Sequence, residues 1–440
     1  GCIARAQELI ADAFDAAHSL MLVNGPDIGL QMAIMSGCDP DDEVILSRNV
    51  HASAASGIVM AGAIPVFTDT HFDQELGLLG NMTLVDLRQA IQQHPRARAL
   101  LLMSPSNHGF APDLDEMVET AHQAGLKVIV DERYGAHFRF HKKLPISGIE
   151  AGADFVVQDW HRCLGALEQG AVLHVREDPG ERWGRIRNVF QTMTTTSPSY
   201  LVMASLDLAR HNAVIHGREL LDHCIGLARE IAGSIDRLKG LSVLGYEMLR
   251  RSDVDNIDST RLTISVTDCG LSGYRFAQLL EEEHDITVDG AEENNLILSV
   301  GFQLSEEDAY RLIDAMEAVV EAYGRQAPLY VSVQRPYPVF SSKLVLAPRA
   351  AFFAPGRLVK ISDSVGCICS EIVSHHTSGM PLVFPGEEIT SEMVDYIIAV
   401  GARDATEFWR NDPTLQVLRV VDERRTILHR SYLRGVGGDQ

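Results

Sequence analysis

The sequence of 440 residues lacks any apolar run near the ~20 residues that a membrane-spanning helix requires. It also lacks a Cys-x-x-Cys pair, and its seven cysteines are scattered, so neither a disulfide framework nor a cysteine-based metal site is expected. Free thiols of this kind are typical of a protein in the reducing cytoplasm. Basic residues are few beside acidic ones, and the net charge of -22 argues against nucleic acid and anionic membranes as partners. The acidic surface serves solubility or attracts a cationic small molecule, and composition alone leaves both open.

Short apolar runs alternate with amphipathic segments in the first half of the chain. Nearly continuous apolar strands are typical of a parallel sheet that helices cover on both faces. The predicted strands are residues 44–46, 64–67, 99–103, 127–130 and 155–157, and helical spacing is found in residues 84–93 and 113–124. The alternation predicts the α/β class, with a doubly wound, mostly parallel sheet in a large domain over residues 1–215. Residues 216–325 mix strands and helices and are predicted to form a small α+β domain.

Two aspartates directly follow predicted strands of the large domain. Asp131 comes after the run 127–130, and Asp159 lies just beyond the run 155–157. Ligands of doubly wound sheets bind at the carboxyl ends of the strands. Both carboxylates are therefore predicted to lie at the ligand-binding edge of the sheet.

Many ordered runs along the chain resemble one known family. They are Leu22-Val-Asn-Gly25, Ser47-Arg-Asn-Val-His51, Asp131-Glu132, Gly152-Ala-Asp-Phe-Val-Val-Gln158, Thr196-Ser-Pro-Ser-Tyr200, Leu206-Asp-Leu-Ala-Arg210, Ala347-Pro-Arg-Ala-Ala-Phe352 and Pro385-Gly-Glu387. These runs are similar to those of the Orn/Lys/Arg decarboxylases, pyridoxal-phosphate (PLP) enzymes with the aspartate aminotransferase fold. The resemblance implies a PLP-transferase-like large domain and a C-terminal α+β domain over residues 335–440. It also implies a homodimer, because Ser197 lies in a segment that crosses to the neighbouring subunit in that family.

The segment that carries the coenzyme lysine in the family differs in this chain. Where the family has Ser-x-His-Lys, the sequence has Asp159-Trp160-His161-Arg162. A lysine can give up its proton and form a Schiff base with an aldehyde, whereas a guanidinium with a pKa above ~12 stays charged. The resemblance therefore places Arg162 at the position of the missing lysine, and the sequence predicts a protein that binds no coenzyme.

The turn that holds the coenzyme phosphate in the family is also altered. It is Gly25-Pro26-Asp27-Ile28-Gly29 here, so that a proline removes a backbone donor and Asp27 adds negative charge. Asp159 would bring a second carboxylate to the same phosphate. In another interpretation, Pro26 and Asp27 simply begin a helix, because both residue types favour the first helical turn.

The remaining pocket residues combine retained and changed positions. His51 matches the family's ring-stacking histidine, and Asp131 matches the acid beneath the pyridine nitrogen. Arg133 could pair with Asp131 and neutralise it. The predicted ligand pocket also includes His108 and Tyr134, which lie in altered family runs, Trp160, which lies beside the lysine position, and Ser197, which lies in a retained run. The ring of Trp160 either fills the place of the coenzyme or packs beneath the edge of the sheet.

These changes lead to one main hypothesis of function and two alternatives. The main hypothesis is a pseudoenzyme, kept as a regulatory or assembly subunit. The first alternative is a PLP-independent enzyme for a guanidino or amino substrate resembling arginine, lysine or ornithine. Its candidate catalytic groups are His51, Asp131, Asp159 and His161, with Asp27 as a further ligand. The second alternative is a PLP-dependent decarboxylase of basic amino acids. No spacing in the sequence supports a metal site.

Overall fold

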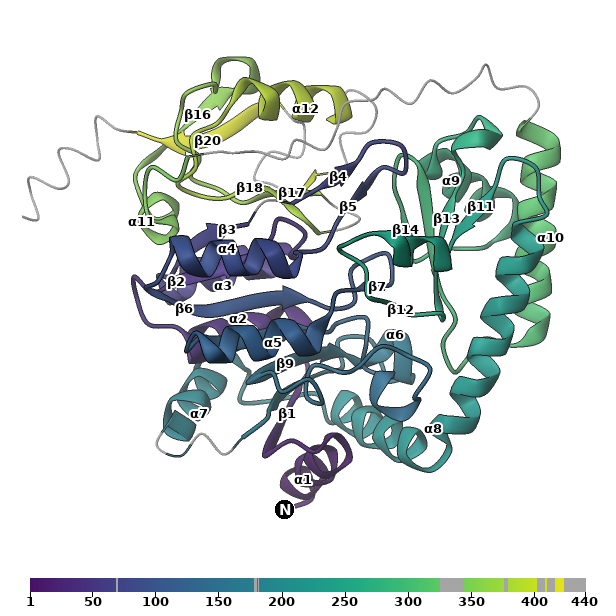
Figure 1. Ribbon diagram of the computed structural model, residues 1–440, viewed down its shortest axis with the longest axis horizontal. Coiled ribbons are helices and arrows are strands. Elements are labelled where there is room, and N and C mark those ends of the chain that lie inside the picture. The colour runs from purple at the N-terminus through teal and green to yellow at the C-terminus, as the bar shows by residue number, and fades with distance from the viewer. Residues whose placement is uncertain are drawn as a thin grey trace, which may run out of the picture.

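Figure 1 shows the computed structural model of the protein, with three groups of elements. The structure describes residues 1–68, 70–177, 180, 182–324, 343–375, 379–401, 408–409 and 416–422. None of the described helices combines the length and the apolar character that crossing a bilayer requires.

A seven-stranded sheet forms the centre of the large domain, in the order β1-β10-β9-β8-β6-β2-β3. Its strands are β1 (His18–Leu22), β2 (Glu43–Leu46), β3 (Ile64–Phe67), β6 (Ala97–Met103), β8 (Lys127–Asp131), β9 (Phe155–Asp159) and β10 (Ala171–Val175). Only β10 among these seven runs antiparallel to both of its neighbours. The α/β class with a mostly parallel sheet is therefore confirmed.

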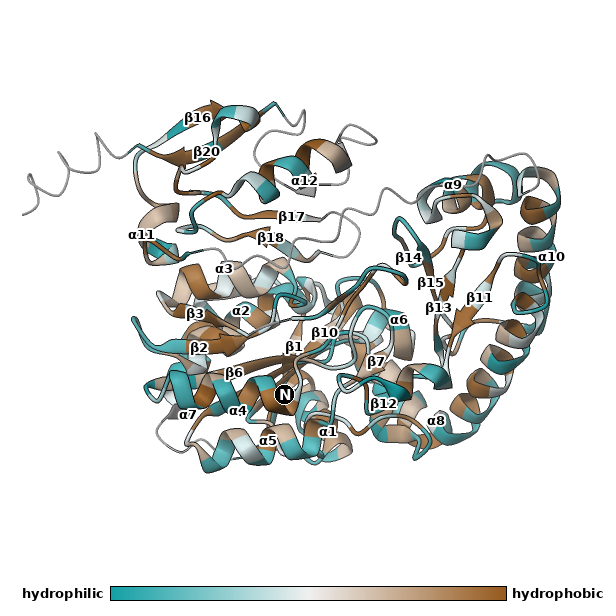
Figure 2. Ribbon diagram, turned by 45° about the horizontal axis from the view of Figure 1, so that its top comes forward, coloured by the Kyte–Doolittle hydropathy of each residue, from teal (hydrophilic) through white to brown (hydrophobic). Residues whose placement is uncertain are grey.

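Helices cover both faces of this sheet, and Figure 2 shows brown strands inside, with teal on the outward sides of α4 (Leu84–Gln93) and α5 (Leu114–Gln123). One apolar core lies between the sheet and α2, α3 and α7, and a second lies between the sheet and α4 and α5. The helices of the large domain are α1 (Cys2–Phe14), α2 (Gly25–Gly37), α3 (Ala52–Ala61), α4 (Leu84–Gln93), α5 (Leu114–Gln123), α6 (Trp160–Leu164) and α7 (Arg182–Met193). Strands buried on both faces explain why the sequence shows apolar runs there rather than alternation.

A long helix, α8 (Tyr200–Ile235), connects the large domain to the small one. The small domain has a four-stranded sheet, β11-β13-β15-β14, packed against α8, α9 and α10. Its elements are β11 (Ser242–Leu244), β13 (Arg261–Ser265), α9 (Gly273–His284), β14 (Gly290–Ala291), β15 (Asn295–Ser299) and α10 (Glu306–Tyr323). The boundary predicted after residue 215 falls inside α8. The next boundary, between residues 325 and 335, lies outside the described residues, so the domain division stays a prediction.

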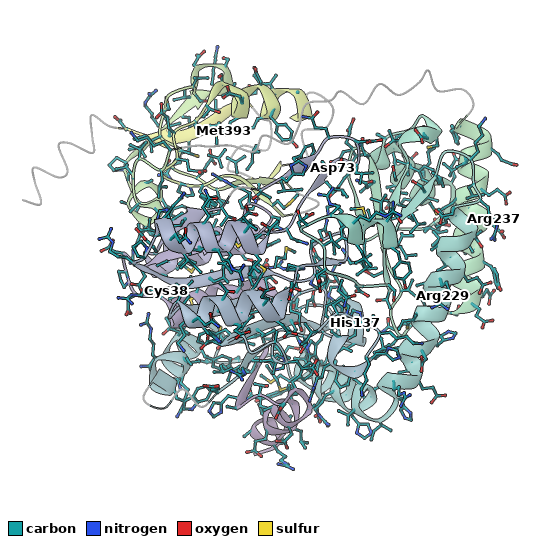
Figure 3. All side chains as sticks on the ribbon, in the orientation of Figure 1. Cys38, Asp73, His137, Arg229, Arg237 and Met393 are labelled. Atoms are coloured by element: carbon teal, nitrogen blue, oxygen red, sulfur yellow. The ribbon has the colours of Figure 1, made fainter. Side chains whose placement is uncertain are left out.

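The C-terminal elements form a separate apolar core above the large domain. They are α11 (Pro348–Phe352), β16 (Gly356–Lys360), β17 (Val373–His375), β18 (Pro381–Val383), α12 (Ser391–Gly401), β19 (Phe408–Trp409) and β20 (Val417–Val421). A hairpin of β4 (Phe72–Asp73) and β5 (Leu78–Leu79) reaches this core from the large domain through Leu79. Asp73 on the same hairpin, labelled in Figure 3, pairs with Arg251 of the small domain at 2.6 Å. The hairpin therefore ties all three parts together.

Candidate active site at the carboxyl edge of the sheet

The carboxyl ends of four strands bring the predicted site residues to one edge of the large domain. Asp131 is the last residue of β8, and Asp159 is the last residue of β9. His51 follows β2 and caps α3, and Asp27 lies in the first turn of α2 after β1. The prediction that both strand-end carboxylates lie at this edge agrees with the observed strand ends.

Two glycines fix the turn between β1 and α2. Gly25 has φ of 80°, in the left-handed region that an L side chain rarely adopts, and its N–H donates to Gln169 O at 2.9 Å. A Cβ on Gly29 would lie 2.7 Å from Leu22 and 2.9 Å from Val157, so the absence of a side chain lets α2 pack closely on the sheet. Helix α2 begins at Gly25 with Asn24 as its N-cap and Pro26 in its first turn. The sequence interpretation of a helix start is therefore correct, although Asp27 is not the cap.

Arg133 is the central residue of the site. Its Nε donates to both carboxylate oxygens of Asp131 at 3.0 Å each, and its Nη2 lies 2.8 Å from Asp131 Oδ2. The side chains of Arg133 and Asp131 are only 6% and 2% exposed, respectively. A carboxylate buried to this degree is stable only with such a partner, so Arg133 neutralises Asp131.

The same guanidinium also reaches two groups outside β8. Arg133 Nη1 donates to Asp27 Oδ1 at 3.1 Å, and Arg133 Nη2 donates to Ser53 Oγ at 3.0 Å. Ser53 Oγ in turn lies 2.9 Å from His51 Nδ1, which also accepts the N–H of Ser53 at 3.2 Å. One buried cation therefore joins the end of β8 to the starts of α2 and α3.

Burial and the neighbouring guanidinium keep His51 neutral. Burial lowers the pKa of His51, and Arg133 lowers it further, to about 3, although Asp27 acts in the opposite direction. Burial raises the pKa of Asp27, but His51 and Arg133 outweigh this effect and hold that pKa below its usual value. At neutral pH the cluster therefore holds two carboxylates and one guanidinium, and its remaining charge is negative.

A second charged cluster surrounds Arg162 at the start of α6. Asp159 caps this helix by accepting the N–H of His161 at 3.2 Å, and it lies 2.9 Å from the His161 ring. Arg162 Nη1 donates to Asp289 at 2.8 Å, whereas its Nε is 3.8 Å from Asp159. Asp27 and Asp159 thus have different cationic partners. That both carboxylates would face one phosphate stays a prediction, and the structure adds that each has a guanidinium beside it.

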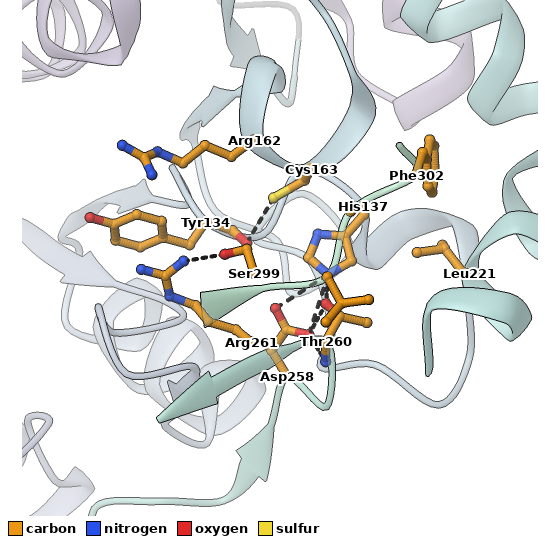
Figure 4. A pocket seen from close by; sticks show the side chains of 12 residues that line it. Tyr134, His137, Arg162, Cys163, Leu221, Asp258, Thr260, Arg261, Ser299 and Phe302 are labelled. Atoms are coloured by element: carbon orange, nitrogen blue, oxygen red, sulfur yellow. Dashed lines mark hydrogen bonds and ion pairs between the residues drawn. The ribbon is translucent and has the colours of Figure 1, made fainter. Parts of the chain in front are cut away.

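Figure 4 shows the pocket on the small-domain side of Arg162. Arg261 lies beneath the ring of Tyr134, with its guanidinium carbon 4.1 Å from the ring centroid. Arg261 also donates to Ser299 Oγ at 2.6 Å and contacts Asp289 at 3.3 Å. Two arginines from different domains therefore meet at Asp289, which places this pocket at the junction of the large and small domains.

Three further predicted pocket residues have other surroundings. His108 Nε2 lies 2.9 Å from Glu292 of the small domain, with its side chain 4% exposed. Trp160 is fully buried; its Nε1 donates to Gln158 at 2.9 Å and its ring packs beside Phe14. Trp160 therefore belongs to the core beneath the sheet edge, and the idea that it fills a ligand's place is wrong. Ser197 is exposed, and the structure does not bring it to the site within one chain.

His137 forms a buried ion pair between the large and small domains, next to the same pocket (Figures 3 and 4). Its Nε2 lies 3.2 Å from Asp258 Oδ2 and 3.0 Å from Thr260 Oγ1. Burial alone would lower the pKa of His137, but Asp258 raises it to about 10, with Cys163 adding to the rise. A histidine whose pKa is higher in the folded than in the unfolded state stabilises the fold only while it is protonated.

We expect this pair to make the free energy of unfolding depend on pH. Its contribution, on the order of 5 kcal/mol, is complete below the unfolded pKa of ~6.5 and is lost as pH rises towards 10. Denaturant titrations of wild type and His137→Gln should therefore give a stability difference that shrinks between about pH 6.5 and pH 10. A difference that stays constant over this range would contradict the assignment.

Sequence reasoning missed several residues that the site uses. Ser53, Arg261 and Asp289 complete the two clusters, and Gly379 O accepts the N–H of Ala52 at 2.7 Å next to His51. Their positions in the sequence give no signal, because they join the site from other domains or by tertiary contact. Within the described residues, no group of three or more His, Cys, Asp or Glu side chains could hold a metal ion.

Comparisons with known proteins identify the family of this chain. The family model "Orn/Lys/Arg decarboxylase, major domain" matches residues 1–249. The chain belongs to the Orn/Lys/Arg decarboxylase family. An arginine decarboxylase of Bacillus subtilis is 34% identical, with 97% of this chain and 87% of the relative aligned. An arginine decarboxylase of Bacillus anthracis is 33% identical over 97% of this chain and 86% of its own length. A lysine decarboxylase structure from Francisella novicida has a TM-score of 0.80 at 18% identity, over 95% of this chain and 71% of that one, and supports the fold alone.

These relatives correct two expectations from the sequence. The main hypothesis of a pseudoenzyme is wrong, because relatives similar over nearly the whole chain are named arginine decarboxylases. The expectation of a protein without a coenzyme is wrong for the same reason, since membership of this family points to PLP. The changes at Arg162 and Asp27 are local, whereas the similarity to the relatives extends over 97% of the chain.

Proposed function

We propose that this protein decarboxylates a basic amino acid of the arginine class with PLP as its coenzyme. The observation that carries the proposal is the 34% identity to an arginine decarboxylase over 97% of the chain. PLP supplies an electron sink for decarboxylation, and the protein supplies binding, orientation and electrostatics. The site described above is where those contributions would come from.

The residues of the site are of types that could hold the coenzyme. By the family resemblance, His51 would stack on the pyridine ring, and Asp131 would pair with the ring nitrogen. Both lie at the carboxyl edge of the sheet, where ligands of such folds bind. In the present arrangement, however, Arg133 holds both oxygens of Asp131, so the coenzyme fits only after this side chain has moved.

The charge of the site supports a basic substrate. Among the described residues, carboxylates outnumber guanidinium groups in the site: Asp27, Asp131, Asp159 and Asp289 pair with the guanidinium groups of Arg133, Arg162 and Arg261. His51 does not add a positive charge, since its pKa lies far below neutrality. A site with residual negative charge favours the ammonium or guanidinium end of arginine, lysine or ornithine.

The proposal also concerns how the coenzyme is held, which depends on Arg162. The resemblance places it at the position of the Schiff-base lysine, and a guanidinium cannot form that bond. The coenzyme would therefore be held without a covalent bond to the protein, by contacts from residues such as His51 and Asp131. This makes the chain a divergent member of its family.

The proposal also includes an oligomeric state and a cellular compartment. We expect a homodimer, and exposed apolar residues along the first half of α8 support it: Tyr200, Leu201, Leu208, Val214 and Ile215. Sedimentation velocity would check this, since a monomer at micromolar concentration would refute it. All seven cysteines are free, which suits a reducing cytoplasm.

The activity can be tested by the release of carbon dioxide. With saturating PLP, wild-type protein should release carboxyl-labelled carbon dioxide from arginine, lysine or ornithine, with arginine preferred. Asp131→Asn should lower the rate on the order of 100-fold, because it removes the charge beneath the ring nitrogen. Asp363→Asn, which changes an exposed aspartate of the C-terminal region, is the matched control and should keep the wild-type rate. Absence of release from all three amino acids would refute the proposal.

A further inference from the structure

Arg133 contacts more acceptors than an arginine that served only to pair with Asp131 would need. Its guanidinium satisfies three separate acceptors, Asp131, Asp27 and Ser53, which come from three different elements around the site. By the resemblance, Asp131 belongs to the pyridine nitrogen and the Asp27 turn to the phosphate. A single side chain therefore spans the two ends of the coenzyme's expected place.

Arg133 and the coenzyme need the same carboxylate. Asp131 has two oxygens, and Arg133 Nε donates to both of them at 3.0 Å while Nη2 lies at 2.8 Å from one. A protonated pyridine nitrogen would be a second cation competing for that pair of oxygens. Because Arg133 already donates to both oxygens of Asp131, a protonated pyridine nitrogen would have to displace part of this pairing to reach the carboxylate.

We propose that Arg133 is an internal competitor of PLP, which closes the coenzyme site by pairing with Asp131 and opens it by turning away. The inference rests on the proposed function, because it assumes that PLP is the ligand. The pairing would also keep the site folded when no coenzyme is bound. Without a cation, Asp131 would be an uncompensated buried charge, which is strongly destabilising.

The side chain of Arg133 can leave the site on the side of Asp27. Asp27, its second partner, is 47% exposed, so the contact at that end lies next to solvent. Exposed ion pairs contribute little to the free energy of unfolding. The buried ion pair with Asp131 therefore accounts for most of the stability that is lost when Arg133 leaves the site. A ligand that supplies its own cation to Asp131 replaces that contact directly, and Arg133 can then move towards solvent.

PLP binding by equilibrium dialysis tests the proposal without relying on turnover. Arg133→Ala should bind PLP at least tenfold more tightly than wild type, because the competitor is gone. Arg133→Gln keeps a polar side chain at the same place and should also bind more tightly, which guards against poor folding of the alanine variant. Arg139→Ala removes the same charge from a more exposed pair with Glu150 and is the matched control, with wild-type affinity expected.

Thermal unfolding gives a second measure on the same proteins. Without PLP, Arg133→Ala should unfold at a lower temperature than wild type, because Asp131 has lost its partner. Saturating PLP should raise the unfolding temperature of Arg133→Ala more than that of wild type. In the double variant Arg133→Ala with Asp131→Asn, the gain in PLP affinity should disappear.

The outcomes separate this inference from the proposed function. Equal or weaker PLP binding by both Arg133 variants would overturn the competitor role while leaving PLP as the coenzyme. Failure of wild type and of every variant to bind PLP would overturn the proposed function itself. Tighter PLP binding by Arg133→Ala and Arg133→Gln, with unchanged binding by Arg139→Ala, would support the competitor role of Arg133 and also PLP as the coenzyme.

Discussion

Replacing Arg162 with lysine is expected to turn PLP from a non-covalent into a covalent ligand. A lysine amine can lose its proton and attack the coenzyme aldehyde with loss of water, whereas a guanidinium remains charged and unreactive. Arg162 follows Asp159 at the end of β9 and lies within reach of the carboxylates of the site. After borohydride reduction, wild type should carry no bound coenzyme, and Arg162→Lys should carry about one per chain.

Mass spectrometry of the reduced proteins measures this effect directly. Arg139→Lys makes the same chemical change outside the site and is the matched control, expected to stay unlabelled. A reduced adduct on a native lysine of the wild-type chain would show that the covalent bond is made elsewhere. Absence of an adduct on Arg162→Lys that nevertheless binds PLP would show that position 162 does not face the aldehyde.

Removing Arg48 is expected to have the largest effect on stability. Arg48 joins the large domain to Glu387 of the C-terminal region, with the two side chains 4% and 0% exposed. Its guanidinium carbon also lies 3.7 Å from the ring centroid of Phe67 and 5.8 Å from that of Phe384. Arg48→Ala should lower the free energy of unfolding by about 3–5 kcal/mol, because it leaves a buried carboxylate without its cation.

Chemical denaturation can compare this loss of stability with the loss caused by removing an exposed ion pair. Arg88 and Glu116 form an ion pair whose side chains are 54% and 49% exposed. Arg88→Ala should therefore change the free energy of unfolding by no more than ~1 kcal/mol. If the two alanine variants lost similar amounts of stability, the link through Arg48 would not be what holds the C-terminal elements to the large domain.

Local sequence patterns predicted much of the fold because their causes are local. The helix predicted over 84–93 matches α4 to the residue, and it begins with a capping box formed by Thr83 and Asp86. The direction of β10 could not be predicted, because an apolar run looks the same in a parallel and an antiparallel strand. Helix α8 likewise crosses the predicted domain boundary because its amphipathic pattern continues unchanged.

The candidate site was predictable only where its contacts are short in sequence. The pairing of Arg133 with Asp131 follows from a separation of two residues, and the structure contains it. The contacts of Arg133 with Ser53 and of Arg162 with Asp289 depend on how distant elements pack, which no spacing reveals. The same limit explains why the sequence did not show which guanidinium groups accompany Asp27 and Asp159.

A crystal structure of the wild-type protein with PLP, at a concentration that saturates binding in solution, tests the central claim most directly. The pyridine ring should lie between His51 and Asp131, with the guanidinium of Arg133 turned away from the Asp131 oxygens. Arg133 still paired with both oxygens, and no coenzyme beside His51, would contradict the claim.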